Sequence, residues 1–508
     1  MAKIYEFGEI TIKTETQTKN SPLSTRRDRA ATVKKIYIGI YVVYQAAILS
    51  ACGSRFNDRD SFAYSGINHT TDEERVSTIT KGFNVTMTAC PERIWPDYNW
   101  SQKKIYLTNK KTRKAFAWYG SKSEKNRVES IELTSLRPGL SQGLYSFDPR
   151  EPNAMGLSLD QSQEYLRAED NSPKADFLIS LGIHEGFHFF AQPSWKRPES
   201  KASNDSRAVD YPILTEPRYL RGKLLKLLKA HLKNPSEKAL QEARGIYDTY
   251  EQKYSGEAKG IASTDQQEGT AFYAEIVGTA ISQLGCAIDE KTLLSKSLEQ
   301  LQTSPDISGT SDSESYALGA AAGLIMRSSQ DYAGWEKKIV EGQTPLAILL
   351  ENIHPQIGPD DANLKQKAEE IVKQENQRFS SGVSQFLASV KDPDAVTIHL
   401  KSSNLLGSYN TQGFIRHRDT GKYLTLNFSG SFGKGSSDSS ILRVTDLTLE
   451  ESDSPNICGD SGWIAHIPRK FVKMGQSTGN IEFQHIMGKN IPISTKVDSM
   501  GRLWICTF

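Results

Sequence analysis

The segment LGIHEGFHFFAQ, residues 181–192, constrains the fold more than any other part of the chain. It places His184 and His188 four positions apart, with Glu185 between them, in surroundings that are otherwise almost wholly apolar. Burying two imidazoles and a carboxylate without partners costs several kcal/mol, so something must compensate them. A bound metal ion is the first candidate for that compensation.

The residues around this segment predict a helix over 173–191. Pro173 falls in the first turn, where its missing N–H does no harm. On such a helix His184 and His188 lie one turn apart and project from the same face, so that two ring nitrogens can bind one ion. Glu185 lies beside them and fits the base that takes a proton from metal-bound water, whose pKa the ion lowers to about 7.

A catalytic zinc also needs a third protein ligand and an open position for water. The residues after His188 lack the Gly and His of the extended three-histidine motif, so a carboxylate from elsewhere must serve. The helix expected at 264–285 carries EGTAFY, which starts at Glu268. These two helices together resemble the gluzincin metallopeptidases, in which a second helix supplies the metal-binding glutamate. The resemblance implies a zincin-like fold and Zn²⁺ held by His184, His188 and Glu268, with Glu185 as general base in peptide-bond hydrolysis.

Other residues remain candidates for roles at this centre. Glu275 lies two turns after Glu268 on the same face, and is either the third ligand or the group that orients a ligating histidine through its other N–H. Asp265 is a further possible ligand. Zincins commonly supply a Tyr or His that donates to the developing oxyanion. We take Tyr316 as the first candidate for that donor and Tyr273 as the second.

The segment KKIYIGIYVVYQAAILSACGS has two lysines, an apolar run too short for a spanning helix, and then Leu-Ser-Ala-Cys. These four residues resemble the lipobox of bacterial lipoproteins, in which the cysteine is diacylated and becomes the first mature residue. The resemblance implies that residues 1–51 are a leader with a lipoprotein signal peptide, and that Cys52 anchors the protein to a membrane of the bacterial cell envelope. Gly53 follows the pattern for outer-membrane sorting if the source is diderm. An uncleaved signal anchor is the alternative.

The rest of the chain divides into three parts. Residues 52–78 are polar without apolar periodicity and predict a tether. Residues 79–390 begin with alternating runs, the first of them GFNVTMTAC at 82–90, which predict three or four strands before residue 140. Short alternating runs return in residues 391–508 and predict an antiparallel β domain. The fold class is therefore α+β, with a mainly helical catalytic domain that includes a small N-terminal β portion, followed by a C-terminal β domain.

Between the two β portions the periodicity predicts helices. The clearest are at 173–191, 216–233, 236–254, 264–285, 312–328 and 361–390.

Four cysteines remain if Cys52 carries lipid, namely Cys90, Cys286, Cys458 and Cys506. An even number in an exported protein permits disulfides, and a bond between Cys458 and Cys506 would close the last domain. Free buried thiols are the alternative.

Composition excludes some classes of function. Apolar residues make up 37% of the chain and charged residues 24%, which excludes a multi-span membrane protein. The net charge is +2 and no long basic run occurs, so we expect no nucleic-acid partner. The expected partners are a peptide or protein substrate and a membrane. Two alternatives to a zinc hydrolase stay open: a noncatalytic binding or adhesion lipoprotein on a zincin scaffold, and a structural metal protein with a closed fourth position.

Overall fold

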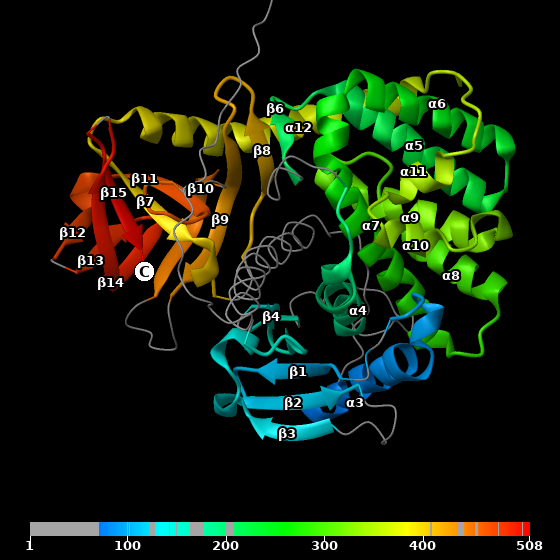
Figure 1. The fold of residues 1–508 in the computed structure, drawn as a ribbon, viewed down its shortest axis with the longest axis horizontal. Coiled ribbons are helices and arrows are strands. Elements are labelled where there is room, and N and C mark those ends of the chain that lie inside the picture. Colours follow the sequence, from blue (N-terminus) through cyan, green and yellow to red (C-terminus); the bar gives the residue numbers. More distant parts are fainter. Residues whose placement is uncertain are drawn as a thin grey trace, which may run out of the picture. The chain divides into compact units, whose positions relative to one another are not determined.

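The computed structural model describes residues 71–98, 100, 102–120, 128–141, 143–148, 150–162, 177–198, 207–406, 409–433, 441–452, 456–475, 477–499 and 501–507. The leader, Cys52, Gly53 and most of the expected tether lie outside the described residues. The fold class of the described residues is α+β, with a small mixed sheet, a central helical region and a mostly antiparallel C-terminal sheet (Figure 1).

The described chain begins with a helix. Helix α3, Asp72–Phe83, starts at the N-cap Thr71, whose hydroxyl accepts a hydrogen bond from the backbone N–H of Glu74. Acidic side chains fill its first turn, where they meet the positive end of the helix dipole. A π-helix at Asn84–Ala89 continues it.

Two sequence expectations are wrong in this region. Residues 72–78, expected in the tether, lie in α3, and residues 82–90, expected to form a strand, are almost wholly helical. The segment alternates apolar and polar residues, but the apolar side chains that it buries are those of Phe83, Met87 and Cys90. These residues are four and three positions apart, which is the spacing of one face of a helix. Burial of this face therefore favours a helix over a strand in this segment.

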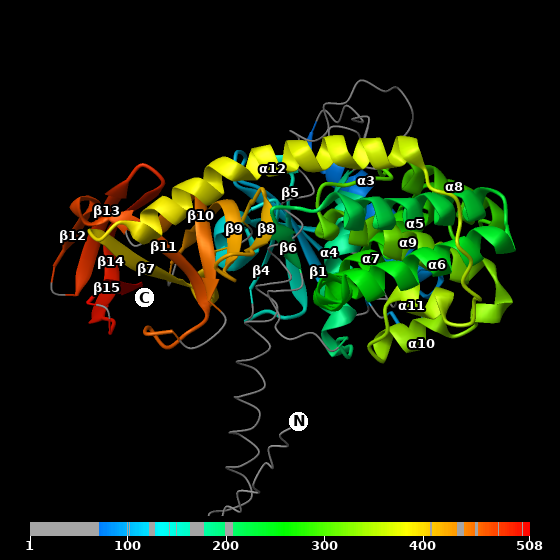
Figure 2. The same cartoon turned by 90° about the horizontal axis from the view of Figure 1, so that it is seen from above.

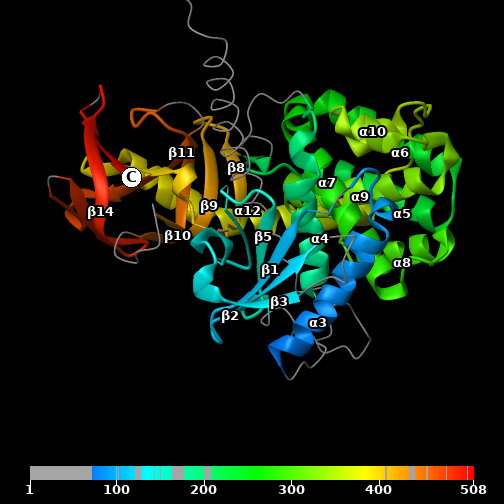
Figure 3. The same cartoon turned by 60° about the horizontal axis from the view of Figure 1, so that its bottom comes forward.

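The N-terminal sheet has the strand order β3-β2-β1-β5-β4. Strand β1 is antiparallel to β2 and parallel to β5, and β4 forms the edge antiparallel to β5. Phe83 of α3 packs on Trp118 of β2 with ring centroids 5.5 Å apart, and Figure 3 shows α3 beside this sheet. The alternating runs of residues 103–120 and 127–136 thus contain strands as predicted. The strands are Lys104–Asn109 (β1), Lys114–Tyr119 (β2), Val128–Glu132 (β3), Tyr145–Phe147 (β4) and Ala154–Ser158 (β5).

Each helix predicted from periodicity has a counterpart in the central region. The largest difference is that α7 begins at Ser255 and not near residue 264, so that Ser263 and Thr264 lie inside the helix. The Ser263 hydroxyl accepts a hydrogen bond from Gln267 one turn along. The described helices of this region are Phe177–Phe190 (α4), Thr215–Lys233 (α5), Glu237–Lys253 (α6), Ser255–Leu284 (α7), Glu290–Gln302 (α8), Ser311–Ser328 (α9), Trp335–Val340 (α10), Pro345–Leu350 (α11) and Ala362–Lys391 (α12).

The C-terminal sheet has the strand order β12-β13-β14-β15-β7-β11-β10-β9-β8-β6 in the described part of the chain. Strand β6, Val209–Tyr211, comes from the segment between α4 and α5 and pairs in parallel with β8, Gly413–His417. Helix α12 reaches from α5 to this sheet (Figure 2). The other strands are Ala395–Lys401 (β7), Tyr423–Phe432 (β9), Leu442–Ser452 (β10), Gly462–Pro468 (β11), Val472–Met474 (β12), Thr478–Phe483 (β13), Ile486–Val497 (β14) and Leu503–Thr507 (β15).

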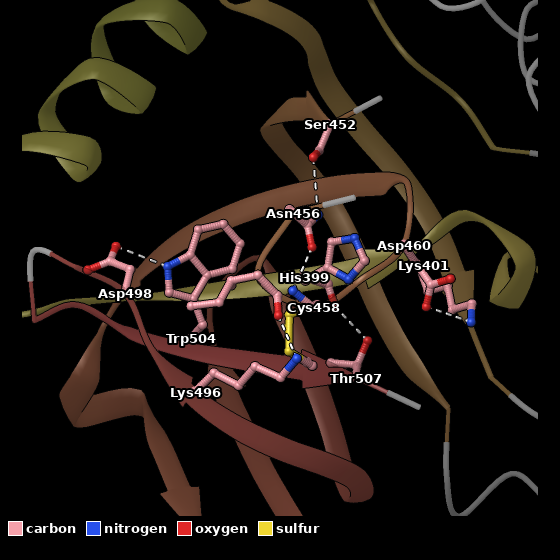
Figure 4. Close-up of a disulfide and its surroundings, with 12 residues drawn as sticks. His399, Lys401, Ser452, Asn456, Cys458, Asp460, Lys496, Asp498, Trp504 and Thr507 are labelled. Carbon is pink, nitrogen blue, oxygen red and sulfur yellow. Dashed lines mark hydrogen bonds and ion pairs between the residues drawn. A yellow bond between two sulfur atoms is a disulfide. The ribbon is translucent and has the colours of Figure 1, made fainter. Parts of the chain in front are cut away.

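Two disulfides are present among the described residues. Of the two alternatives open for Cys458 and Cys506, a disulfide or free thiols, the disulfide is present, and it ties the segment between β10 and β11 to β15 (Figure 4). Cys90 and Cys286 form the second bond, between the end of the π-helix and the residues just after α7. No helix in the described ranges combines the length and the apolar character needed to cross a bilayer.

Candidate metal centre

Helices α4 and α7 bring three side-chain atoms into a compact triangle. Nε2 of His184 lies 3.1 Å from Nε2 of His188. Oε2 of Glu268 lies 3.2 Å from the His188 nitrogen and 3.4 Å from the His184 nitrogen. Four ligands placed tetrahedrally at about 2.0–2.1 Å from a zinc ion would be about 3.3–3.4 Å apart. The triangle therefore has the size that one such ion requires.

The local sequence explains how these side chains meet. The i, i+4 spacing puts both imidazoles on one face of α4, with ring centroids 4.7 Å apart. Helix α7 packs closely against that helix, as the backbone at Gly278 shows. A Cβ added to this glycine would lie only 2.8 Å from the side chain of Ile183. The hydroxyls of Ser180 and Thr279, 3.0 Å apart, join the two helices in the same region.

The outer nitrogen of each histidine faces an acceptor. Nδ1 of His188 lies 2.8 Å from Oε1 of Gln192, and the Gln192 amide nitrogen donates to the carbonyl of Gln267 and the hydroxyl of Thr270. Nδ1 of His184 lies 2.9 Å from Oε2 of Glu275. Each Nδ1 thus has an acceptor outside the triangle, and the Nε2 atoms, which face Oε2 of Glu268, are the ring atoms that can bind an ion.

The charges of the group follow from its burial and its partners. Burial alone would raise the pKa of Glu268, but the positive charges of His188 and Arg207 and hydrogen bonds with both histidines lower it well below its usual value. Burial alone would lower the pKa of His184, yet Glu268 and Glu275 raise it. Glu268 is therefore an ionised carboxylate at neutral pH, and it favours positive charge between itself and the rings.

Arg207 contacts the other oxygen of Glu268. Its Nη1 donates to Oε1 of Glu268 at 2.8 Å, and its Nη2 lies 2.8 Å from Oδ1 of Asp312. The pKa of Arg207 is raised well above its usual value, because the two carboxylates outweigh the effect of burial. Sequence reasoning missed both Arg207 and Gln192. Of the two, only Gln192 could have been indicated by the sequence, because it lies four residues after His188.

The candidate donors lie in different places. The Tyr316 ring is stacked on that of His184, with centroids 5.8 Å apart, and its OH lies 3.4 Å from Nη2 of Arg207. The OH of Tyr273 instead accepts a hydrogen bond from Arg327, and its ring packs against Trp335. Tyr316 is thus beside the triangle, whereas Tyr273 has other partners.

The alternative ligands are occupied elsewhere. Asp265 accepts hydrogen bonds from Arg221 at 2.7 Å and from Ser315 at 2.6 Å. Glu275 contacts the outer nitrogen of His184 and does not join the triangle. Among the acids in the described ranges, Glu268 is the one that completes the group with the two histidines.

The centre is deeply buried. His184 is 3% exposed, His188 and Glu268 are each 2% exposed, and Glu185 is fully buried next to His184. A cavity of about 680 Å³ lies at the C-terminal end of α4, but its lining includes none of these four residues. Its walls include Trp95, Tyr98, Lys103, Phe190, Trp195 and Glu336.

Comparison of the chain with models of known protein families, with curated proteins and with solved structures finds no match. Fold and site together define an α+β protein whose helical region contains a buried His-His-Glu group that can hold a metal ion.

Proposed function

We propose that this protein is a zinc-dependent hydrolase that cleaves peptide bonds. The observation that carries the proposal is the convergence of three acceptor atoms, from His184, His188 and Glu268, at 3.1–3.4 Å from one another. Both Nδ1 atoms face acceptors outside the triangle, so the two Nε2 atoms and the carboxylate oxygen are left to bind one cation between them. Two nitrogen donors and one carboxylate oxygen suit zinc in a catalytic site, where a fourth position stays open.

The roles of the residues follow from their chemistry. Zn²⁺ held by His184, His188 and Glu268 would supply a Lewis acid and lower the pKa of a water at the fourth position to about 7. Glu185, the neighbour of His184, accepts the proton of the attacking water as general base and passes it to the leaving amine. The Tyr316 OH, close to the Arg207 guanidinium, donates to the oxyanion that forms on the substrate carbonyl.

We also propose that the protein acts in the bacterial cell envelope, anchored through lipid on Cys52, and in the outer membrane if the source is diderm. The leader at 1–51 and the tether that follows it support this location, as argued from the sequence. The two disulfides add support, because such bonds persist mainly in oxidising compartments.

A structural metal centre is a second candidate, which the burial of the site favours. The three proposed ligands are at most 3% exposed, and the cavity next to α4 is lined by other residues. A closed site of this kind would stabilise the helical region without hydrolysing a substrate.

The variant Glu185→Gln separates the two functions. For a hydrolase, we expect cleavage of a peptide library to fall by about 10²–10⁴-fold, as loss of a general base predicts, while one zinc per chain remains bound. Glu257→Gln, on α7 and paired with Arg218, is the matched control and should keep both properties. The structural centre would be supported if the wild-type chain binds zinc but cleaves no peptide, and if a hydroxamate does not bind to the zinc-loaded chain.

A further inference from the structure

We infer that Arg207 is a positioning residue that holds the Glu268 carboxylate so that one of its oxygens faces the two histidines, and that it links the metal centre to the C-terminal sheet. This inference rests on the proposed metal site. It concerns a residue that no motif in the sequence indicates.

The two oxygens of the Glu268 carboxylate have separate partners. Oε1 accepts from Nη1 of Arg207 at 2.8 Å, while Oε2 lies 3.2–3.4 Å from the Nε2 atoms of the two histidines. Rotation of the carboxylate about its last bond would move Oε2 away from the rings or place both oxygens near them. The hydrogen bond with Arg207 prevents that rotation and presents a single oxygen, Oε2, to the ion.

Arg207 is itself held from the other side. Its Nη2 lies 2.8 Å and 2.9 Å from the two oxygens of Asp312, at the start of α9. A planar guanidinium can contact two carboxylates at once through separate nitrogens, which a lysine ammonium cannot reproduce at fixed geometry. The three charges of Glu268, Arg207 and Asp312 leave one net negative charge beside the histidines, which suits a cation there.

The backbone of this segment belongs to the C-terminal sheet. Two residues after Arg207 the chain enters β6, which pairs with β8, and Asp210 of β6 bonds to Arg416 of β8 at 2.7 Å and 2.9 Å. The guanidinium carbon of Arg207 also lies 5.4 Å from the ring centroid of Phe414, in β8. The position of Arg207 is therefore set by the C-terminal sheet, so that this sheet contributes to the metal centre.

The test is the zinc dissociation constant of the full chain, measured by competition with a chromophoric chelator. Arg207→Met should weaken zinc binding by about 10–100-fold, the range for loss of a group that orients a ligand. Arg207→Lys should also weaken it, because the charge remains but the two-pronged geometry does not. Phe414→Leu should weaken binding on the order of a few-fold.

Arg221→Met is the matched control. Arg221 is another buried arginine, which pairs with Asp265 and Glu314 and touches none of the three proposed ligands. The Arg221→Met variant should have a lower thermal unfolding midpoint in the metal-free chain and the same zinc dissociation constant as the wild type. If Arg207→Met does not fold, the zinc dissociation constants of Arg207→Lys and Phe414→Leu test the inference.

The outcomes are distinguishable. Zinc affinities of Arg207→Lys and Phe414→Leu equal to wild type would overturn the inference, even if His188→Ala abolishes binding. A wild-type chain whose zinc affinity does not depend on His188 or Glu268 would instead overturn the proposed metal site.

Discussion

Oε2 of Glu275 lies 2.9 Å from Nδ1 of His184, on the opposite side of the imidazole from the nitrogen that faces Glu268. Both side chains are buried, so little water competes with this contact. The carboxylate orients the ring and makes its Nε2 a stronger donor to a cation. For Glu275 we therefore propose the orienting role, and not that of third ligand, which was the other role open to it.

We therefore expect Glu275→Gln to weaken zinc binding by about tenfold, the lower end of the usual range for such partners, because an amide oxygen can still accept from Nδ1–H but carries no charge. Chelator competition measures the effect. Glu257→Gln, in the same helix, is the control and should bind zinc as the wild type does. Equal affinities for the Glu275 variant and the wild type would show that the contact does not support the ligand.

The close approach of α7 and α9 gives a prediction about stability. A Cβ at Gly319 would overlap the Cα of Gly269, and neither backbone can move without separating the helices that carry Glu268 and Tyr316. Gly319→Ala should lower the free energy of unfolding by about 1–3 kcal/mol, as overpacking does. Gly256→Ala is the control in α7, because nothing lies within 4 Å of its Cβ position. That change should leave stability equal or raise it by up to about 1 kcal/mol. Denaturant unfolding compares the two, and equal effects would contradict the close packing.

Loss of the C-terminal disulfide should destabilise the sheet that it closes. The sequence separation of Cys458 and Cys506 is 48 residues, and closing a loop of that length in the unfolded chain is worth about 4 kcal/mol in the chain-entropy estimate. The double variant Cys458→Ser, Cys506→Ser should therefore unfold at clearly lower denaturant concentration than the oxidised wild type. Reductant should have no further effect on the C-terminal transition of that variant. An unchanged midpoint would mean that the bond contributes nothing to stability.

His399 should make the stability of the same sheet dependent on pH. Burial lowers the pKa of His399 to about 4, with Asp460 opposing the shift and Lys401 adding to it. The unfolded histidine titrates near 6.5, so between these values the unfolded chain binds a proton that the folded chain does not. The buried, neutral state of His399 contributes fully to the free energy of unfolding above about pH 6.5. This contribution is lost as the pH falls toward 4, which lowers the free energy of unfolding by at most about 3 kcal/mol. Denaturant unfolding at pH 7 and pH 5 should show a smaller loss for His399→Gln than for wild type, and equal losses would contradict the buried neutral state.

The parts of the site that follow from local spacing were predictable from sequence. One helical turn fixes the relation of His184 to His188, so their shared face needs no tertiary information. Glu268 was indicated by the resemblance of the two helices to gluzincins, and Glu275 by its helical spacing from Glu268. Gln192 has the same spacing, four residues after His188, but it lies just beyond the helix predicted at 173–191.

Arg207 could not be found in this way. Its position depends on the pairing of β6 with β8, and the contact between Asp210 and Arg416 spans 206 positions in the sequence. The helical structure of residues 82–90 also depends on tertiary contacts. The segment fits both periods, and packing of Phe83 on Trp118 of the sheet supports the helical one.

The most direct test of the central claim is X-ray absorption at the zinc edge of the full chain loaded with one equivalent of zinc. We expect four nitrogen or oxygen neighbours at about 2.0–2.1 Å, two of them imidazoles, with one imidazole lost in His188→Ala. An all-oxygen shell, or a shell that is the same in the His188→Ala chain, would contradict the claim that His184, His188 and Glu268 bind one ion together.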